Sequence, residues 1–393
     1  MLPDLTKKER IKLLHRQLTS DFRKRILDGR LPAGTRLPND NELAAEYKLS
    51  RDTIRQALAL LVDEGLIERV QGRGTFVCQP PTRSSSVKAT PTQKQIGLLL
   101  SIGDRSGGAC PQDILIGVEQ AVKSHGYSVN LSYNEGDQEQ QMRDIARMSG
   151  NHVAGLIICP VAKATDADVM QQLQSAQVPL VFVDRYLTGG EVDYVGADNE
   201  GGGHRATEHL IILGHRRIGF LYLAEESLET TSSVRERWQG YRDALQKYGV
   251  PYDPSLAVGD INPKHVSANP KHASASPSIY DFLQRPDRPS AIFAVNDLVA
   301  LDVMQAAHAL HLRVPQDLAL VGFDNEHFAA RVNPPLTTIA QPFFDIGQRA
   351  GSLLVNRIEG NTTAPKHIEL PVNLLIRESC GAQLHVLRAR EEQ

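Results

Sequence analysis

Arg51, Thr53 and Arg55 lie within about one and a half helical turns of one another at the start of a helical pattern. An arginine can donate two parallel hydrogen bonds to a guanine edge or to a phosphate, and a threonine hydroxyl can donate or accept one. Apolar residues recur at helical spacing from Ile54 to Val62, so the three polar side chains are predicted to face away from the core. A helix with this set at its N-terminal end is suited to the major groove of DNA.

A second helical pattern and a hairpin pattern flank this helix and are expected to position it. Asn39 can cap the first helix in a capping box with the glutamate three residues later, and Ser50 can cap the second helix. Apolar and β-branched residues on both sides of a glycine-rich tip predict a hairpin over residues 66–77. At that tip Arg73 can enter a minor groove, and the backbone at Gly74 can approach a phosphate.

This segment has two interpretations. A solvated helix followed by a surface hairpin is the alternative, but the spacing, the two caps and the hairpin together favour DNA binding. The segment also resembles the winged helix-turn-helix of GntR-family repressors over roughly residues 8–79. The resemblance implies that Arg51, Thr53 and Arg55 contact operator DNA and that Gly74 lies in the wing. The motifs that carry it are Leu37-Pro38, the run from Ser50 to Leu58, Gly65-Leu66-Ile67 and the run from Arg73 to Val77.

Charge and composition divide the 393 residues into regions. The net charge is −3, but residues 1–80 carry about +4 and the remainder about −7, so the N-terminal region is the part suited to a polyanion. Residues 79–92 are rich in Pro, Ser and Thr and lack periodicity, as in a linker. The expected organisation is a DNA-binding domain over 1–79, a linker over 80–94, a ligand-binding domain over 95–382 and a tail over 383–393.

From Gln95 onward, short apolar runs alternate with helical patterns. Such alternation indicates right-handed βαβ units, with parallel sheets covered by helices on both faces. The alternation starts again near residue 200, which predicts two doubly wound lobes in tandem with a cleft between their strand-to-helix loops. Strands are expected near residues 96–100, 127–132, 155–159, 180–183, 218–222, 256–258, 291–295 and 318–321, with helices between them.

Polar side chains follow several of these strands at the point where each strand ends. Asp184, Asn296 and Asp324 come directly after apolar runs, and Arg237 lies near the start of a helix. Carboxylates and amides can bracket vicinal hydroxyl groups, and an arginine can fork across two oxygens, which suits a sugar or a similar polyol. The alternative for each Asp or Asn is that it caps the helix that follows.

The region over roughly residues 95–380 resembles the ligand-binding domain of the LacI repressor family. The resemblance implies a periplasmic-binding-protein-like α/β fold, a homodimer and a small-molecule effector in the cleft. By position, it implies that Asp184, Arg237, Asn296 and Asp324 hold the effector and that Phe343 forms an apolar wall. The motifs are the runs Asn199–Ile211, Gly214–Gly219, Ala294–Asp297, Arg313–Pro315, Val321–Asn325 and Pro335–Ile339, with Gln341-Pro342.

Patterns for other kinds of site are missing from the sequence. The four cysteines lack metal-ligand spacing and are expected to be free thiols, and His204, His209 and His215 lack acidic partners at ligand spacing. We find no phosphate-binding glycine loop and no nucleophile beside a histidine, so no cofactor, metal or catalytic residue is expected. No run approaches roughly 18 apolar residues and no signal region opens the chain, which predicts a cytoplasmic protein without a membrane span.

Together these patterns predict a transcriptional regulator rather than an enzyme. The expected function is a repressor of sugar-utilisation genes that a small sugar releases from operator DNA. The combination of these two parts resembles the arabinose-responsive repressors, and this resemblance favours a pentose. The alternative, a sugar-handling enzyme or a sugar-binding module with an accessory interaction domain, would require an acid/base pair or a phosphate loop. A transport binding protein would require a signal peptide.

Overall fold

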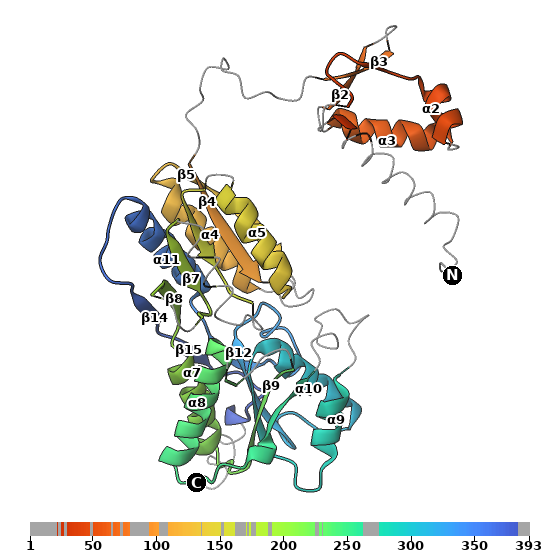
Figure 1. The fold of residues 1–393 in the computed structure, drawn as a ribbon. Coiled ribbons are helices and arrows are strands. Elements are labelled where there is room, and N and C mark those ends of the chain that lie inside the picture. Colours follow the sequence, from red (N-terminus) through yellow and green to blue (C-terminus); the bar gives the residue numbers. More distant parts are fainter. Residues whose placement is uncertain are drawn as a thin grey trace. The chain divides into compact units, whose positions relative to one another are not determined.

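The chain divides into two compact units, residues 1–91 and residues 92–393, which are described separately below. Figure 1 shows both units as ribbons, without a determined placement of one relative to the other. The structure is a computed structural model. It describes residues 22, 25–26, 30–47, 50–63, 66–70, 74–78, 94–101, 109–134, 136–150, 153–161, 170, 173, 178–187, 191–224, 228–229, 231–261 and 275–383.

The described part of the N-terminal unit contains helices α2 and α3, helical residues at 22 and 25–26, and a three-stranded antiparallel sheet (Figure 1). The predicted hairpin is confirmed, since β2 pairs antiparallel with β3 from Ile67 opposite Val77 to Val70 opposite Gly74. A two-residue strand, β1, adds to the other edge of β3 and was not predicted. The elements are β1 (Arg36–Leu37), α2 (Asp40–Tyr47), α3 (Arg51–Asp63), β2 (Ile67–Val70) and β3 (Gly74–Val77).

The predicted apolar stripe forms the core of this unit except at Val62, which is 36% exposed. Ile54, Leu58 and Leu61 of α3 are fully buried, and they belong to one cluster with Phe22 and Ile26. The last two residues lie in the segment 8–30, whose apolar residues recur at helical spacing and most of which is outside the described residues. Because Ile54, Leu58 and Leu61 hold α3 against this core, the side chains at its N-terminal end have a fixed support.

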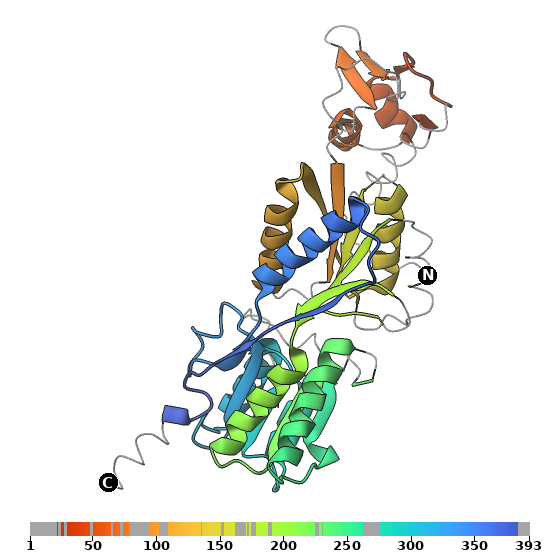
Figure 2. The same cartoon turned by 90° about the vertical axis from the view of Figure 1, so that its left-hand side faces the viewer.

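Lobe 1 of the second unit is a six-stranded parallel sheet in the order β14-β8-β7-β6-β4-β5. Helices α4 and α11 lie on one face and α5 on the other (Figures 1 and 2). The elements are β4 (Lys94–Ser101), α4 (Ala109–Lys123), β5 (Tyr127–Asn134), α5 (Gln138–Gly150), β6 (Gly155–Ile158), β7 (Leu180–Val183), β8 (Asp193–Ala197), α11 (Phe343–Ile358) and β14 (His367–Leu370).

Lobe 2 is a second six-stranded sheet, in the order β10-β9-β11-β12-β13-β15, parallel except for the edge strand β15. Helices α7 and α8 cover one face, and α9 and α10 cover the other (Figures 1 and 2). The elements are α7 (Asn199–Ile212), β9 (Ile218–Leu223), α8 (Ser232–Lys247), η1 (Pro254–Leu256), β10 (Ala257–Ile261), α9 (Pro277–Gln284), β11 (Ala291–Ala294), α10 (Asp297–Ala309), β12 (Ala319–Asp324), β13 (Thr337–Ala340) and β15 (Asn373–Leu375).

The two lobes are not in tandem, so that part of the prediction is wrong. The chain passes between them three times: from β8 into α7, from β13 into α11 and from β14 into β15. Lobe 1 is therefore completed by α11 and β14, which come after almost all of lobe 2. The reason is that β14 pairs with β8, His367 opposite Tyr194, and local sequence patterns do not reveal so distant a pairing.

Pairs of glycines allow the two main helix pairs to pack closely. A Cβ atom at Gly203 of α7 would stand 2.2 Å from the backbone oxygen of Arg237 in α8, and one at Gly240 would stand 2.0 Å from that of Glu200. In lobe 1, a Cβ atom at Gly347 of α11 would likewise meet the backbone of α4. These contacts fix the rotation of α8 about its axis and so the direction in which Arg237 points.

Several predicted segments lie outside the described residues. These are the linker except Lys94, all but Met170 and Leu173 of the helix expected between the strands at 155–159 and 180–183, and all but Gln383 of the tail. Among the helices that are described, none combines the length and the apolar character needed to cross a membrane.

Candidate functional site

Side chains cap the N-terminal ends of helices α2 and α3 in the N-terminal unit. The Asn39 Oδ1 atom accepts a hydrogen bond from the backbone N–H of Glu42 at 3.0 Å, and Glu42 Oε2 accepts one from the backbone N–H of Asn39 at 2.8 Å. Ser50 Oγ accepts from the backbone N–H of Thr53 at 3.2 Å. These bonds confirm the predicted capping box and the predicted cap of α3, and they satisfy N–H groups that a helix leaves open.

Four arginines from three elements line one hollow of about 480 Å³ on this unit, which we term the arginine hollow. The predicted pair Arg51 and Arg55 comes from α3, and both are exposed. The sequence did not single out the other two, Arg36 of β1 and Arg69 of β2. The remaining lining residues are Leu37, Asn39, Asp40, Asn41, Gly74 and Thr75. So dense a group of guanidinium groups makes this face a candidate nucleic-acid interface.

Gly74 lies in the wing hairpin as the resemblance implies, with a φ of +115° that side chains rarely adopt. A Cβ atom at this position would stand 3.0 Å from Nε of Arg36. The missing side chain therefore lets the Arg36 guanidinium lie against the backbone of β3. The hairpin tip with Arg73 is outside the described residues, so its predicted contact stays a prediction.

Thr53 was expected on the exposed side of α3, but its side chain is buried. Its side chain is only 5% exposed, and its hydroxyl is 2.7 Å from Ser50 Oγ, so the predicted exposure is wrong. The position two residues into α3 turns this side chain toward the cap, where a hydroxyl gains a partner. Its contact with DNA stays a prediction.

In the second unit, the predicted effector residues lie at strand ends of both lobes. Asp184 follows β7 of lobe 1, and Asp324 ends β12 of lobe 2. Both adopt positive φ, +63° and +108°, as does Asn325 at +60°. Among the described residues only one other non-glycine residue, His311, has a positive φ. Backbone conformations of this kind are costly and gather at functional sites, so they support a binding role for these strand ends.

Arg237 is the centre of this group, which we term the strand-end cluster: Asp184, Asn199, Arg237, Asp324 and Gln341. The side chain of Arg237 is 6% exposed, and its Nη2 atom is 3.6 Å from Oδ1 of Asp324. Its Nε donates to Asn199 Oδ1 at 2.9 Å, and its Nη1 donates to the backbone oxygen of Val295 at 2.7 Å. Every bond holds the guanidinium in one orientation beside the Asp324 carboxylate.

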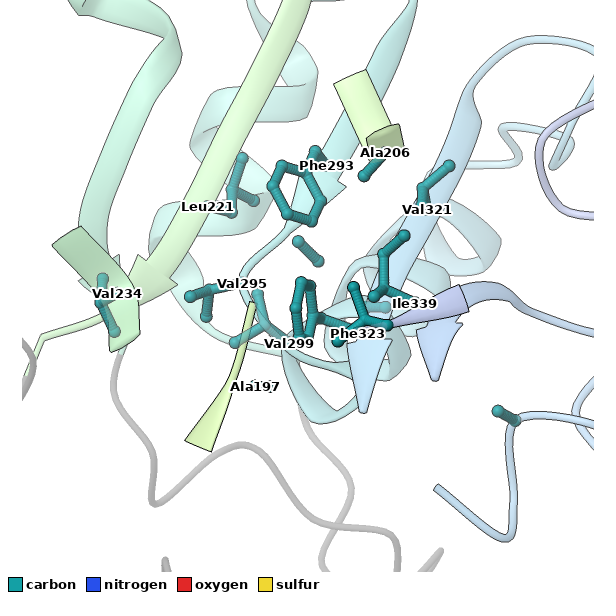
Figure 3. Close-up of a cluster of buried hydrophobic side chains, with 14 of the residues drawn as sticks. Ala197, Ala206, Leu221, Val234, Phe293, Val295, Val299, Val321, Phe323 and Ile339 are labelled. Carbon is teal, nitrogen blue, oxygen red and sulfur yellow. The ribbon is translucent and has the colours of Figure 1, made fainter. Parts of the chain in front are cut away.

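The apolar core of lobe 2 supports Arg237 from beneath. The guanidinium stacks on the ring of Phe323, which packs against Phe293 with the ring centroids 6.4 Å apart. Figure 3 shows these two rings among the buried side chains of β9, β11, β12 and α10, including Leu221 and Val299. A charged group placed above such a rigid layer keeps its geometry when a ligand arrives.

Asp324 has an unusual environment for a carboxylate. Burial raises the pKa of Asp324 to about 7, with a further upward effect from Glu326 and Asp184 and a downward effect from Arg237. Gln341 Nε2 donates to Asp324 Oδ1 at 2.6 Å, and Gln341 Oε1 is buried without a hydrogen-bond partner among the described residues. A buried acceptor without a donor is costly, and a hydroxyl group of a bound ligand could satisfy it.

Asn296 and Phe343 fit their expected roles less directly. Asn296 Oδ1 accepts from the backbone N–H of Val299 at 2.9 Å, so the alternative interpretation as a helix cap applies to this atom. Phe343, the first residue of α11, is 5% exposed and belongs to the apolar core. Their contacts with an effector stay predictions.

A set of contacts between the lobes was not predicted. Tyr186, after β7, donates its hydroxyl to Glu236 Oε1 at 2.6 Å, and Arg235 Nη2 donates to the same hydroxyl at 3.0 Å. The backbone N–H of Tyr186 also donates to Ser232 Oγ at 3.0 Å. Burial raises the pKa of Glu236, and the hydrogen bonds from Tyr186 and Asn199 oppose that rise. These bonds join lobe 1 to the start of α8, beside the strand-end cluster.

Comparisons with known proteins match both units. Residues 14–77 match the model for bacterial regulatory proteins of the gntR family, and residues 207–380 match the periplasmic binding protein-like domain. The arabinose metabolism transcriptional repressor of Geobacillus stearothermophilus is 30% identical over 352 residues, which cover 87% of this chain and 90% of that protein.

Two solved structures share the fold. The complex of the transcriptional regulator CelR with cellobiose superposes with a TM-score of 0.62 and 27% identity, covering 87% of this chain and 100% of that one. A LacI family regulator from Enterococcus faecium with bound ribose superposes with a TM-score of 0.59 and 26% identity, covering 73% of this chain and 98% of that one. All three proteins are named as transcriptional regulators, and none as an enzyme.

Proposed function

Since the chain belongs to the gntR family of bacterial transcriptional regulators, with a periplasmic binding protein-like effector domain, we propose that it represses sugar-utilisation genes. In this proposal a small sugar binds between the lobes and releases the protein from its operator in the cytoplasm. The observation that carries it is the presence, in one chain, of an arginine hollow on a winged helix unit and a strand-end cluster on a two-lobed sensor.

For DNA binding, we propose a homodimer that places two winged units on two half-sites of a roughly palindromic operator. Arg51 and Arg55 reach base edges or phosphates from α3, while Thr53, Arg73 and Gly74 make the remaining contacts. In this arrangement residues 1–79 read DNA, residues 80–94 connect, and residues 95–382 dimerise and sense the effector. Half-sites spaced about 34–36 Å or a multiple apart suit such a dimer.

For the effector, we propose a small polyhydroxyl sugar held by Asp184, Arg237, Asn296 and Asp324, with Phe343 as an apolar wall. The buried Arg237–Asp324 pair supports this choice, because it offers a charged donor and a charged acceptor side by side. Names of the relatives include arabinose, ribose and cellobiose. A pentose is favoured, since two of the three sugars are pentoses and a relative that matches 87% of this chain is an arabinose repressor.

Thermal unfolding of the full chain with a panel of pentoses, hexoses, their phosphates and purines tests the effector. A ligand present at 100 times its dissociation constant raises the free energy of unfolding by about 2.7 kcal/mol. The sugar found in this way should then lower the affinity of the chain for operator DNA in a fluorescence anisotropy titration. The proposed regulation would be contradicted if no sugar in the panel stabilises the chain, or if the stabilising sugar leaves operator affinity unchanged.

A further inference from the structure

One carboxylate stands inside the arginine hollow. Asp40, the first residue of α2, places Oδ2 3.5 Å from Nε of Arg55 and Oδ1 3.3 Å from Nη2 of Arg69. Its two oxygens therefore join α3 to β2. A negative charge on a face suited to a polyanion weakens binding to every DNA sequence alike. Its presence at this place calls for a physical explanation.

An acidic residue in the first turn of a helix commonly complements the helix dipole, and Asp40 occupies such a position. That explanation is incomplete. Glu42 already supplies a carboxylate to the same turn and completes the capping box with Asn39. The dipole also does not require contact with arginines on two other elements. The geometry of the two ion pairs needs a second explanation.

We propose that Asp40 is a positioning residue that makes the arginine hollow selective for base sequence. Its carboxylate pairs with Nε of Arg55, on the side of the guanidinium closest to the side-chain stem. Nη1 and Nη2 at the far end can then donate to a guanine edge. Reading O6 and N7 of guanine requires this two-pronged orientation. The inference rests on the proposed contact of Arg55 with operator bases.

Restraint by Asp40 changes the balance between specific and non-specific binding. The Arg55 side chain is 63% exposed, so without a partner it would sample many conformations. Holding it beforehand reduces the conformational freedom that is lost on binding to the correct base pair. The charge of Asp40 meanwhile repels phosphates at every sequence. The restraint widens the ratio between affinity for the operator and affinity for random DNA, whereas the charge lowers both affinities alike and leaves their ratio unchanged.

The Arg69 contact extends the same restraint to the wing. Arg69 belongs to β2, and its side chain is 39% exposed beside Asp40. The pairing of β2 with β3 places it opposite Thr75, next to Gly74. Asp40 thus ties the hairpin to the N-terminal end of α2, at the same point where it holds Arg55.

The test uses the full chain and two duplexes of equal length: one selected by the wild-type protein from a random library, and one random. Asp40→Asn removes the charge and keeps the shape. Glu68→Gln is the matched control, because it makes the same change in charge on β2. Glu68 is adjacent to Arg69 in the strand, so it points to the opposite face of the hairpin.

For Asp40→Asn we expect affinity for the random duplex to rise about threefold or more and the specificity ratio to fall about tenfold, within the discrimination that one bidentate pair supplies. The preference should be lost at the same base pair of the operator at which Arg55→Ala also loses its preference. In the Arg55→Ala background, Asp40→Asn should cause no further loss of preference at that base pair. Glu68→Gln should change both affinities by the same factor.

Other outcomes overturn the inference. Equal effects of Asp40→Asn and Glu68→Gln would show that only net charge matters. A further loss of preference in the Arg55→Ala background would show that Asp40 does not act through Arg55. If Asp40→Asn is unfolded at the assay temperature, Asp40→Glu is measured instead. This variant keeps the carboxylate and should retain the preference, and its loss in a folded Asp40→Glu protein would contradict the inference. A wild-type protein that selects no sequence would instead contradict the proposed function.

Discussion

The guanidinium carbon of Arg237 lies 3.8 Å from the centroid of the Phe323 ring. Phe323 directly precedes Asp324 in the chain, so the ring and the carboxylate that contact Arg237 are neighbours in sequence. A lysine could not stack in this way, nor could its single ammonium group replace a planar fork that donates to Asn199 and Val295 and also lies beside the Asp324 carboxylate. The binding surface of the sensor therefore depends on one planar side chain held between an aromatic ring and a carboxylate.

We expect Arg237→Met to lower the free energy of unfolding by about 3 kcal/mol at pH 8, because it leaves the buried Asp324 carboxylate unpaired. The loss should be smaller at pH 6, where a carboxyl group with a pKa of about 7 is mostly protonated. Urea unfolding at the two pH values measures both. Arg242→Met, on the exposed side of α8, is the control. A loss of equal size at pH 6 and pH 8 would contradict the assigned pair.

Effector affinity should rise with pH through about 7. Asp324 accepts hydrogen bonds from hydroxyl groups best when it is ionised. Its pKa depends first on burial and then on the charges of Arg237, Glu326, Asp184 and Asp297 around it. For stability the sign is opposite: the folded pKa exceeds the unfolded value of about 3.9. The Asp324 contribution to the free energy of unfolding is therefore complete below pH 4 and is lost as pH rises through about 7.

Isothermal titration of the sugar between pH 5.5 and pH 8.5 measures this dependence. Asp324→Asn should bind more weakly at pH 8 and should lose most of the pH dependence. A wild-type affinity that is constant over this range would refute the role of Asp324 as an ionised acceptor.

Arg51→Ala and Arg55→Ala should each weaken operator binding by roughly 1–3 kcal/mol if the contact is to a base. A contact to phosphate would instead reduce the slope of log affinity against log salt by about one. Both side chains are exposed, so thermal stability should stay close to that of the parent. Anisotropy titrations at two salt concentrations distinguish the cases, with Arg30→Ala, outside the arginine hollow, as the control. Unchanged isotherms for both variants would rule out the assignment.

Tyr186→Phe should weaken effector binding about fivefold, which corresponds to about 1 kcal/mol for one lost hydrogen bond between the lobes. The hydroxyl supplies the 2.6 Å bond to Glu236, whose side chain is 11% exposed. Calorimetry on the variant and on Tyr248→Phe, a tyrosine at the end of α8 on the surface, measures the difference. Equal affinities for both variants and the parent would mean that this hydrogen bond does not contribute to sugar binding.

Local patterns predicted much of the fold because periodicity and caps are local properties. The strand expected over 180–183 coincides with β7, a helix lies as expected between the strands at 127–132 and 155–159, and the capping box of Asn39 and Glu42 forms as expected. Strand β8 was missed although all five of its residues are buried, because a run as short as Asp193–Ala197 beginning with an aspartate has no clear period. That aspartate is paired with Arg357 of α11.

Site residues could be predicted where the residue type and its position next to a strand or helix indicated a role. Polar residues after strands located Asp184 and Asp324, and charge at the start of α3 located Arg51 and Arg55. Arg36, Arg69, Gln341 and Tyr186 became visible only when the strands brought distant segments together, since no local pattern marks them. Thr53 shows the opposite error: helical spacing suggested an exposed side chain, and a nearby hydroxyl cap turned it inward.

The three passages of the chain between the lobes have a consequence for synthesis on the ribosome. Domains fold largely in order of emergence, and the N-terminal unit is complete once its first 91 residues have emerged. Lobe 1 must wait for α11 and β14, so the sensor cannot assemble until translation is almost finished. A nascent or prematurely terminated chain that ends before Phe343 would thus carry a finished DNA-binding unit without its means of release.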